Sequence, residues 1–368
     1  MSLSIGIVGL PNVGKSTLFN ALTKAQNAEA ANYPFCTIEP NKATVAVPDI
    51  RLNVLARMVN PQKVVPATVD FVDIAGLVRG ASKGEGLGNQ FLGNIRECAA
   101  ILHVTRCFED DNITHVDGSV DPARDVETIE MELILADLQS VEKRLEKTLK
   151  MAKADKVMRA LADDLEALVK HLDAGKSAGS FNGSGSETLL KCLQELALLS
   201  AKPVIFCANV DEETLASGED NAPLKELRRL AEERGAHIAV ICAKIEEELQ
   251  GLPAVEQKEI LEAYAITEPG LDKIIRTGYA TLGLVSYFTA GEKEVKAWTI
   301  GQGWKAPQAA GVIHTDFERG FIRAEVVAYD DYVRLGSEAA ARSAGLLRTE
   351  GKEYVVKDGD VMHFLFNV

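Results

Sequence analysis

Eight residues near the start of the chain read Gly9-Leu10-Pro11-Asn12-Val13-Gly14-Lys15-Ser16, which is the pattern G-x-x-x-x-G-K-S. An apolar β-type run precedes them at 4–8, and residues 17–22 have helical spacing. A strand, a glycine-rich turn and a helix in this order form a phosphate-binding loop. Its backbone N–H groups and Lys15 face the phosphates, and the Ser16 hydroxyl binds Mg²⁺. The stretch therefore predicts a nucleoside triphosphate site.

The composition indicates a globular protein with more than one domain. The chain has 368 residues, of which 46% are hydrophobic and 26% charged, and this length predicts two or three domains. No apolar run approaches the ~18 residues of a membrane span, and the first strand leaves no room for a cleaved signal. Six cysteines without a C-x-x-C pair predict buried, reduced thiols in a cytoplasmic protein. The net charge of −14 argues against a globally basic protein that recognises DNA sequence.

Strands and helices alternate along most of the chain up to residue 282. We expect strands at 4–9, 43–48, 68–73, 101–107, 203–210 and 237–243, with helices between most of them. This alternation predicts an α/β fold whose mainly parallel sheet is covered by helices on both faces. The nucleotide-binding domain is expected to comprise residues 1–125 and 202–282.

Residues 126–201 interrupt this alternation. No proline or glycine occurs from Asp125 to Asp173, and apolar residues recur there at spacings of three and four. The pattern predicts an insertion of two long amphipathic helices that fold back as an antiparallel coiled hairpin. Residues 283–368 contain short β-type runs at 297–300, 321–327, 354–356 and 362–366. They predict a separate α+β module.

Two further elements of a triphosphate site follow the phosphate loop. Asp73-Ile74-Ala75-Gly76 matches D-x-x-G, in which Asp73 holds a metal-bound water and the Gly76 amide senses the γ-phosphate. Thr37 lies where a switch loop belongs and is the favoured residue to add its hydroxyl to Mg²⁺. Thr44 is the competing candidate, although it lies in strand-like sequence. We therefore expect Ser16, Thr37 and Asp73 at the metal and Gly76 with Lys15 at the reacting phosphate.

The residue that positions the attacking water is not evident from the motifs. Leu77 stands after D-x-x-G, where glutamine is usual, and its side chain cannot hydrogen-bond water. Slow hydrolysis, or hydrolysis that needs a partner, is therefore expected. Asn12 either helps to hold a monovalent cation such as K⁺ beside the phosphates or only stabilises its loop. His115 either takes part in catalysis or is a solvated loop residue.

The base-recognition segment departs from the GTPase pattern N-K-x-D, because the chain reads Asn209-Val210-Asp211-Glu212. The lysine that packs on the base is missing, and the carboxylate at the fourth position is one methylene longer. Adenine N1 repels a carboxylate but accepts a backbone N–H, so Asn209 and the Val210 backbone predict adenine rather than guanine. The loop Cys242-Ala243-Lys244 resembles the S-A-K loop that closes a base pocket, which adds Ala243 to the nucleotide contacts.

A basic segment is the exception to the acidic average. Residues 143–159 contain seven basic and two acidic side chains where the hairpin should turn. A basic tip on a projecting arm suits contact with RNA, and a solvated helix face is the alternative. Residues 283–368 contain ten basic and twelve acidic side chains. Their charge does not mark an RNA-binding module, and a protein contact there remains open.

Together these motifs resemble the Obg-like ATPase family, also called YchF, over essentially the whole chain. The resemblance also rests on NYPFCTIEP at 32–40, SKGEGLGN at 82–89 and HTDFERGFIRAEV at 314–326. It implies a G-domain-like P-loop domain, a coiled-coil insertion and a C-terminal TGS domain of β-grasp type. It also implies ATP preferred over GTP, association with ribosomes, and base contact by Asn209 and Val210. At matching positions the resemblance also implies phosphate binding by Asn12, Val13, Gly14, Lys15, Ser16 and Thr17.

Three functions compete at this point. The favoured one is a regulatory ATPase whose nucleotide state controls docking to the ribosome or to a protein partner. A conventional GTPase switch is the second, and the segment 209–212 disfavours it. The third is an ATP-gated binding module with negligible turnover, which Leu77 would allow.

Overall fold

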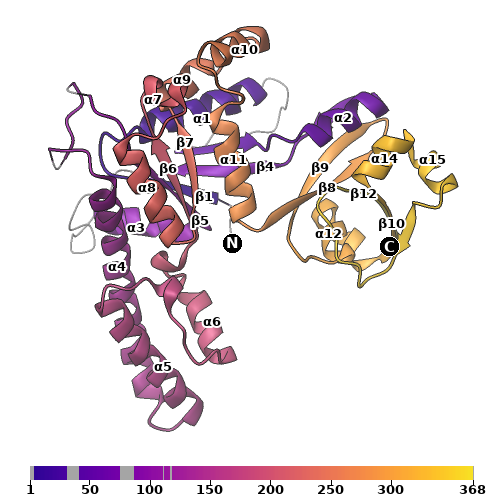
Figure 1. The fold of residues 1–368 in the computed structure, drawn as a ribbon. Coiled ribbons are helices and arrows are strands. Elements are labelled where there is room, and N and C mark those ends of the chain that lie inside the picture. The colour runs from indigo at the N-terminus through magenta and orange to yellow at the C-terminus, as the bar shows by residue number, and fades with distance from the viewer. Residues whose placement is uncertain (1–3, 31–40, 75–86, 111, 117, 368) are drawn as a thin grey trace. The chain divides into compact units, whose positions relative to one another are not determined.

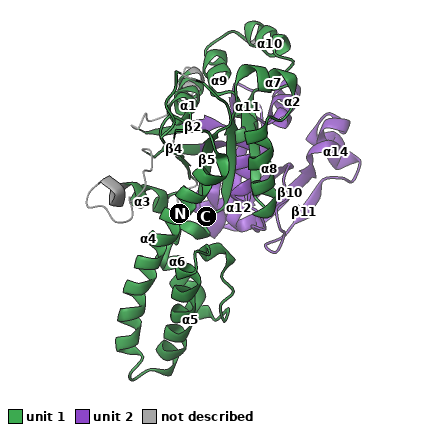
Figure 2. Ribbon diagram, turned by 60° about the vertical axis from the view of Figure 1, so that its left-hand side comes forward, with its two compact units in different colours: residues 1–43, 70–274 green, residues 44–69, 275–368 purple. Residues whose placement is uncertain are grey.

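The structure is a computed structural model that describes residues 4–30, 41–74, 87–110, 112–116 and 118–367. The chain forms two compact units (Figure 2). Unit 1 comprises residues 1–43 and 70–274, and unit 2 comprises residues 44–69 and 275–368. The segment between residues 44 and 69 therefore belongs with the C-terminal part of the chain, although it lies early in the sequence.

Unit 1 is built around a six-stranded sheet with the order β2-β4-β1-β5-β6-β7 (Figure 1). The strands are β1 Ser4–Val8, β2 Lys42–Ala46, β4 Thr68–Asp73, β5 Ala100–Arg106, β6 Val204–Asn209 and β7 His237–Ile241. The pairs β1–β4, β1–β5, β5–β6 and β6–β7 are all parallel. Every residue of β1 and β5 is buried, which explains their continuous apolar runs. The predicted mainly parallel sheet is confirmed.

Helices surround this sheet. They are α1 Lys15–Ala30, α3 Leu87–Glu97, α7 Glu212–Ser217, α8 Ala222–Glu233, α9 Ala243–Leu249, α10 Ala254–Ala263 and α11 Gly270–Thr281. The apolar side of α8 packs against β6 through Leu224 and Leu227, which meet Phe206. The parallel strands place the loops before α1, α7 and α9 at the same edge of the sheet, where the phosphate loop lies.

The insertion in unit 1 is a helical arm (Figures 1 and 2). Its elements are α4 Pro122–Met151, α5 Lys156–Asp173, the 3₁₀ turns η1 Ala178–Ser180 and η2 Leu199–Ala201, and α6 Glu187–Leu196. Val141 on α4 and Leu165 and Leu168 on α5 share one apolar core, so the predicted hairpin of two long helices is confirmed. At the base of the arm, buried Asp137 accepts hydrogen bonds from the Leu199 N–H at 2.8 Å and the Ser200 N–H at 2.7 Å.

Unit 2 contains a second six-stranded sheet with the order β11-β10-β12-β8-β9-β3. Its strands are β3 Lys63–Val65, β8 Leu284–Ala290, β9 Glu294–Gly301, β10 Phe321–Ala328, β11 Arg348–Glu350 and β12 Asp360–Phe366. Its helices are α2 Ile50–Val59, α12 Ala306–Ile313, α13 Thr315–Arg319, α14 Tyr329–Leu335 and α15 Glu338–Ser343. The expected strand at 354–356 is wrong. The Ala306 N–H donates to the Tyr354 carbonyl and the Val356 N–H donates to the Trp304 carbonyl, so this segment pairs with the chain before α12 and not with the sheet.

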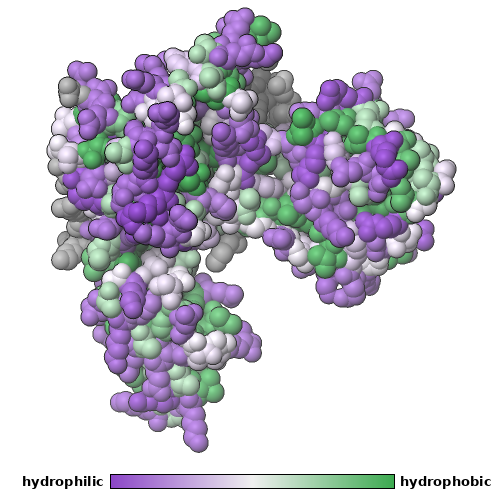
Figure 3. All heavy atoms as spheres, viewed as in Figure 1, coloured by the Kyte–Doolittle hydropathy of each residue, from purple (hydrophilic) through white to green (hydrophobic). Residues whose placement is uncertain are grey.

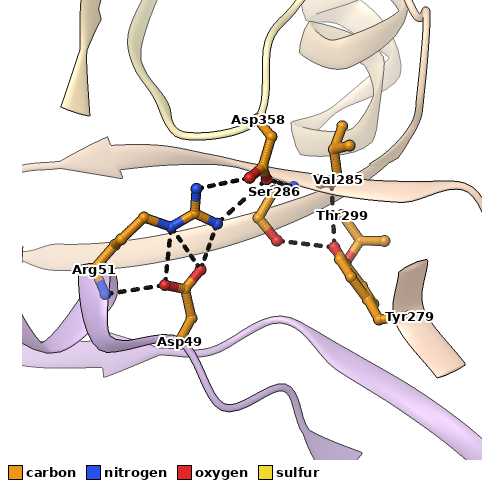
Figure 4. A network of polar contacts seen from close by, with 7 residues as sticks. All are labelled: Asp49, Arg51, Tyr279, Val285, Ser286, Thr299 and Asp358. Atoms are coloured by element: carbon orange, nitrogen blue, oxygen red, sulfur yellow. Dashed lines mark hydrogen bonds and ion pairs between the residues drawn. The ribbon is translucent and has the colours of Figure 1, made fainter. Parts of the chain in front are cut away.

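A polar network holds the segment 44–69 within unit 2 (Figure 4). Arg51 lies between two carboxylates, with Nε donating to Asp49 Oδ1 at 2.9 Å and Nη1 donating to Asp358 Oδ2 at 2.7 Å. Asp358 also accepts the Ser286 N–H at 2.9 Å, and the Ser286 hydroxyl lies 2.8 Å from that of Tyr279. Because β3 also pairs with β9 in parallel, this segment is an integral part of the second unit.

The described cysteines are buried free thiols, as expected; they are Cys98, Cys107, Cys192, Cys207 and Cys242. Burial raises the pKa of Cys107 to about 12, which keeps that thiol protonated. Cys36 lies outside the described residues. Among the described helices, none is both long enough and apolar enough to cross a membrane.

Candidate nucleotide site

A cavity of about 820 Å³ lies at the carboxyl edge of the sheet in unit 1. Its walls come from the phosphate loop after β1, the loop after β5, the segment after β6 and the loop after β7. Ligands of parallel α/β sheets bind at this edge because the loops that follow neighbouring strands converge there. The cavity brings together the predicted phosphate-binding residues and the predicted base-recognition residues.

The phosphate end of the cavity is lined by Asn12, Gly14, Lys15, Ser16 and Thr17. Helix α1 begins at Lys15, so the free N–H groups of its first turn lie beside the loop, as anion binding requires. Gly14 has φ of +99°, and a Cβ at this position would lie 2.2 Å from Asn209 Nδ2. Only glycine therefore fits between the phosphate loop and the base-recognition segment.

Lys15 is buried at the phosphate end, and its ammonium donates to the Leu10 carbonyl oxygen at 2.6 Å. Burial lowers the pKa of Lys15 to about 8, and the negative charge of Asp73 opposes this shift. Burial also raises the pKa of Asp73, which Lys15 in turn lowers. The charges of Lys15, at the start of α1, and Asp73, at the end of β4, thus act on each other. A bound triphosphate would add negative charge that favours the ammonium form of Lys15.

The residues present fit a magnesium ion. The Ser16 side chain reaches the cavity and Asp73 ends the neighbouring strand β4, so both supply the hard oxygen donors that Mg²⁺ prefers. Within the described ranges, no group of three or more His, Cys, Asp or Glu could hold a metal. Mg²⁺ sites commonly use one or two protein oxygens together with phosphate oxygens and water. Thr37, Gly76 and Leu77 lie outside the described residues.

Asn209 joins three loops at the base end of the cavity. Its Nδ2 donates to the Val13 carbonyl oxygen at 2.9 Å, and its Oδ1 accepts the Ala243 N–H at 3.0 Å. These bonds leave one N–H of the amide group and one lone pair of its oxygen for a ligand. Sequence reasoning treated Asn209 as a base contact and missed this structural role, which depends on which strands are neighbours.

The backbone of Val210 does not offer the expected donor. Its N–H donates to the Ile241 carbonyl oxygen at 2.8 Å, because the pairing of β6 with β7 continues one residue beyond β6. The expectation that this N–H meets adenine N1 is therefore wrong in this structure. Val210 still lines the cavity together with Ala243. Both residues are therefore where the base is expected, although the Val210 N–H is already hydrogen-bonded to Ile241.

The carboxylate at the fourth position of the base motif forms an exposed ion pair with a lysine. Lys244 Nζ lies 2.7 Å from Glu212 Oε1, and both residues line the cavity. In a GTPase the corresponding carboxylate is an acidic acceptor for the edge of guanine. Here the ion pair turns the Glu212 acceptor towards Lys244, at the rim where Lys244 is exposed.

His115 is not among the residues that line this cavity, and it is not a solvated loop residue either. It is 7% exposed, and its Nε2 lies 3.0 Å from Asp125 Oδ2 in the first turn of α4. The neighbouring Thr114 carbonyl accepts a hydrogen bond from Asn12 Nδ2 at 3.1 Å. The structure thus ties the phosphate loop to the segment that carries His115, which supports a loop-stabilising role for Asn12.

Comparison with known proteins agrees with this geometry. Residues 4–137 match a family model described as a 50S ribosome-binding GTPase. Residues 284–367 match the model for the C-terminal part of YchF GTPases, described as a protein of unknown function. The chain is 54% identical to the ribosome-binding ATPase YchF of Bacillus subtilis and 52% identical to that of Escherichia coli O157:H7, with all of each chain aligned. The solved YchF GTPase of Schizosaccharomyces pombe superimposes with a TM-score of 0.88 at 40% identity, covering 98% of this chain and 97% of that one.

Proposed function

This chain belongs to the YchF family, and on that premise we propose that it is a ribosome-associated ATPase whose nucleotide state controls docking to its partner. Full-length relatives that are more than half identical carry the name ribosome-binding ATPase, which confirms the family resemblance of the motifs. The reaction is hydrolysis of the phosphoanhydride bond of ATP, with GTP a weaker ligand. We expect slow turnover because Leu77 replaces the usual water-orienting glutamine.

The observation that carries the choice of ATP is the ion pair between Glu212 and Lys244. A carboxylate that reads guanine must be free to accept hydrogens from the base. Glu212 is engaged by Lys244, and Val210 replaces the lysine that would pack on the base. Both changes remove interactions that favour guanine, so adenine is no longer at a disadvantage.

The site residues divide the work between the phosphates, the metal ion and the base. Lys15 and the backbone from Asn12 to Thr17 bind the phosphates, with Gly76 at the γ-phosphate. Ser16 and Thr37 would hold Mg²⁺ directly and Asp73 would hold it through water, and the ion would offset negative charge on the phosphates. Asn209, Val210 and Ala243 surround the base. The amide oxygen of Asn12 is the ligand that it would offer to K⁺, since its Nδ2 donates to the Thr114 carbonyl.

His115 remains the proposed residue for positioning the attacking water. In the structure its Nε2 faces Asp125, so the imidazole must leave this carboxylate to act in the cavity. Asn12 links the phosphate loop to Thr114, the residue before His115. A movement of the phosphate loop on binding phosphates would therefore be transmitted to His115 through Asn12 and Thr114.

The arm is the proposed contact with ribosomal RNA, in a cytoplasmic protein. Helices α4 and α5 turn at residues 152–155, at the centre of the basic segment 143–159, and hydrophilic residues cover the end of the arm in Figure 3. The exposed cations of this tip are Lys143, Lys147, Lys150, Lys153, Lys156 and Arg159. The expected nucleotide domain of 1–125 with 202–282 differs from unit 1, because residues 44–69 and 275–282 belong to unit 2. We propose 1–43, 70–125 and 202–274 as the nucleotide domain, 126–201 as the docking arm and 283–368 as a TGS domain open to protein contact.

The test is ATP and GTP turnover by the full chain with and without ribosomes, together with co-sedimentation in ADP and in a non-hydrolysable ATP analogue. We expect ATP turnover to rise when ribosomes are added and co-sedimentation to differ between the two nucleotides. Preferred turnover of GTP would indicate a conventional GTPase. Nucleotide-dependent sedimentation without any turnover would indicate an ATP-gated binding module.

A further inference from the structure

Arg106 is a buried cation that the proposed chemistry does not use. It is the last residue of β5 and is 2% exposed, among the largest fully buried side chains described. Removing a guanidinium group from water is costly unless its donors find good acceptors. A buried guanidinium at this position therefore needs acceptors for its donors.

The donors of Arg106 go to the main chain of the loop that follows β5. Nε donates to the Phe108 carbonyl at 3.0 Å, Nη2 to the Asp110 carbonyl at 3.1 Å and Nη1 to the Ile113 carbonyl at 2.8 Å. The guanidinium carbon also lies 4.7 Å from the centre of the Phe108 ring. The five donors of a planar guanidinium are spread over three nitrogens in a fixed fork, so the group reaches three separate carbonyls at once. The three donors of a lysine ammonium all leave one nitrogen atom and do not reproduce this spread.

The loop held in this way forms a wall of the nucleotide cavity. Phe108, Asp110 and Ile113, here called the loop wall, all line it. In the sheet order β1-β5-β6, this wall lies between the phosphate loop after β1 and the base segment after β6. Arg106 is paired in register with Asn209, and the Cys107 N–H donates to the Asn209 carbonyl at 2.8 Å. The loop wall therefore adjoins the base end of the cavity.

We propose that Arg106 is a positioning residue for the nucleotide base: it fixes the loop wall so that the Phe108 ring packs against the purine. This inference rests on the proposed nucleotide site and adds a residue to it. The stem of the GTPase lysine is missing at Val210, so the base needs another apolar surface. Phe108 is the aromatic residue among the described residues that line the cavity, and aromatic rings stack on any base.

The test compares a ligand that has a base with one that has none. Arg106→Lys keeps the positive charge but replaces the rigid fork of donors with a single nitrogen atom, so the three carbonyls lose their fixed spacing. We would measure the Kd of the full chain for Mg·ATP and for Mg·tripolyphosphate by calorimetry, and take the ratio of the two. We expect the Kd for ATP to rise at least tenfold in the variant and that for tripolyphosphate to change less than threefold.

The alternatives are distinguishable. If Arg106→Lys loses the same affinity for both ligands, or none for ATP, the proposed role of Arg106 is overturned. The proposed nucleotide site is not affected by that result. A wild-type chain that binds neither ligand overturns the proposed function and this role with it. Phe108→Leu leaves the three carbonyls in place and should by itself weaken ATP relative to tripolyphosphate at least fivefold. An unchanged ratio in that variant overturns the proposal even where Arg106→Lys does not fold.

Two comparisons separate positioning from a general loss of stability. Arg96 also donates to main-chain carbonyls, those of Leu196 at 2.5 Å and Ala197 at 3.3 Å, but it does not line the cavity. Arg96→Lys should lower the melting temperature and leave the ATP-to-tripolyphosphate ratio within twofold of wild type. Because Arg106 acts through Phe108, the double variant Arg106→Lys with Phe108→Leu should lose little more ATP affinity than Arg106→Lys alone. The proposal would be overturned if Arg96→Lys shifted the ratio of the two Kd values as much as Arg106→Lys does. It would also be overturned if the losses of ATP affinity in Arg106→Lys and Phe108→Leu multiplied in the double variant.

Discussion

Asn209 donates from its Nδ2 to the carbonyl oxygen of Val13 at 2.9 Å, so a buried hydrogen bond joins the base segment to the phosphate loop. The other end of the same amide accepts the Ala243 N–H at 3.0 Å. Gly14 must lack a side chain because a Cβ would lie 2.2 Å from this Nδ2. The two halves of the nucleotide site are therefore one structural unit.

Replacing Asn209 with alanine should weaken the fold and the site together. The Val13 carbonyl and the Ala243 N–H would lose their partners, and each buried polar group left unpaired costs roughly 1–3 kcal/mol. We expect urea denaturation to show a free energy of unfolding lower by about 2–4 kcal/mol, and calorimetry to show weaker ATP binding by at least tenfold. Wild-type affinity in Asn209→Ala would mean that the phosphate loop does not depend on this bridge.

The buried ammonium of Lys15 makes ATP binding dependent on pH. Its pKa is lowered by burial to about 8, and a triphosphate favours the charged form, so the pKa rises on binding. Below pH 8 the group is charged in both states and takes up no proton. As the pH rises above about 8, binding takes up a proton and the affinity falls, by at most about tenfold per pH unit.

Calorimetry at pH 9 in two buffers of different ionisation enthalpy measures this proton uptake. Lys15→Arg stays charged at that pH and should take up none. Equal uptake by wild type and Lys15→Arg would assign the proton to another group. Lys15→Ala should lose most of its ATP affinity at every pH, because the phosphates lose the cation supplied by the motif.

A role for His115 in positioning water predicts an effect on turnover without one on binding. His115→Ala should lower kcat for ATP at least tenfold and leave the Kd within twofold, since this residue does not line the cavity. His171 provides a matched control, because it lies on the arm and bonds to Ser177 and Ser180. His171→Ala should change neither quantity. An unchanged kcat in His115→Ala would leave this histidine as a structural partner of Asp125.

The basic tip of the arm predicts salt-dependent docking. Replacing Lys147, Lys150, Lys153 and Lys156 with glutamate should weaken co-sedimentation with ribosomes and flatten its dependence on salt, because fewer counterions are released. ATP affinity should not change, since the arm lies outside the cavity. Four exposed cations of unit 2 serve as a comparison: Lys293, Arg319, Arg323 and Lys352. If their reversal and not that of the arm abolishes docking, the contact lies in residues 283–368.

The phosphate end of the site could be predicted from sequence because its parts are consecutive. Gly14, Lys15 and Ser16 act through one turn, and the strand and helix around them show in the local pattern. Strand β3 has only three residues and shows no local sequence pattern that predicts it, because its place in the second sheet is set by pairing with β9.

The base end depends on neighbours that spacing does not show. The Val210 N–H is used by Ile241 because β6 and β7 are adjacent. Arg106 ends an apolar run, and nothing in the run indicates that its guanidinium turns back to Phe108 and Ile113.

The central claim is that Glu212, held by Lys244, no longer selects guanine. Calorimetric titration of the full chain with Mg·ATP and with Mg·GTP tests it most directly. We predict that ATP binds at least as tightly as GTP, and that Lys244→Ala, which frees Glu212, shifts the ratio of the two Kd values towards GTP. A wild-type preference for GTP of tenfold or more, roughly 1.4 kcal/mol, would contradict the account and make the protein a conventional GTPase.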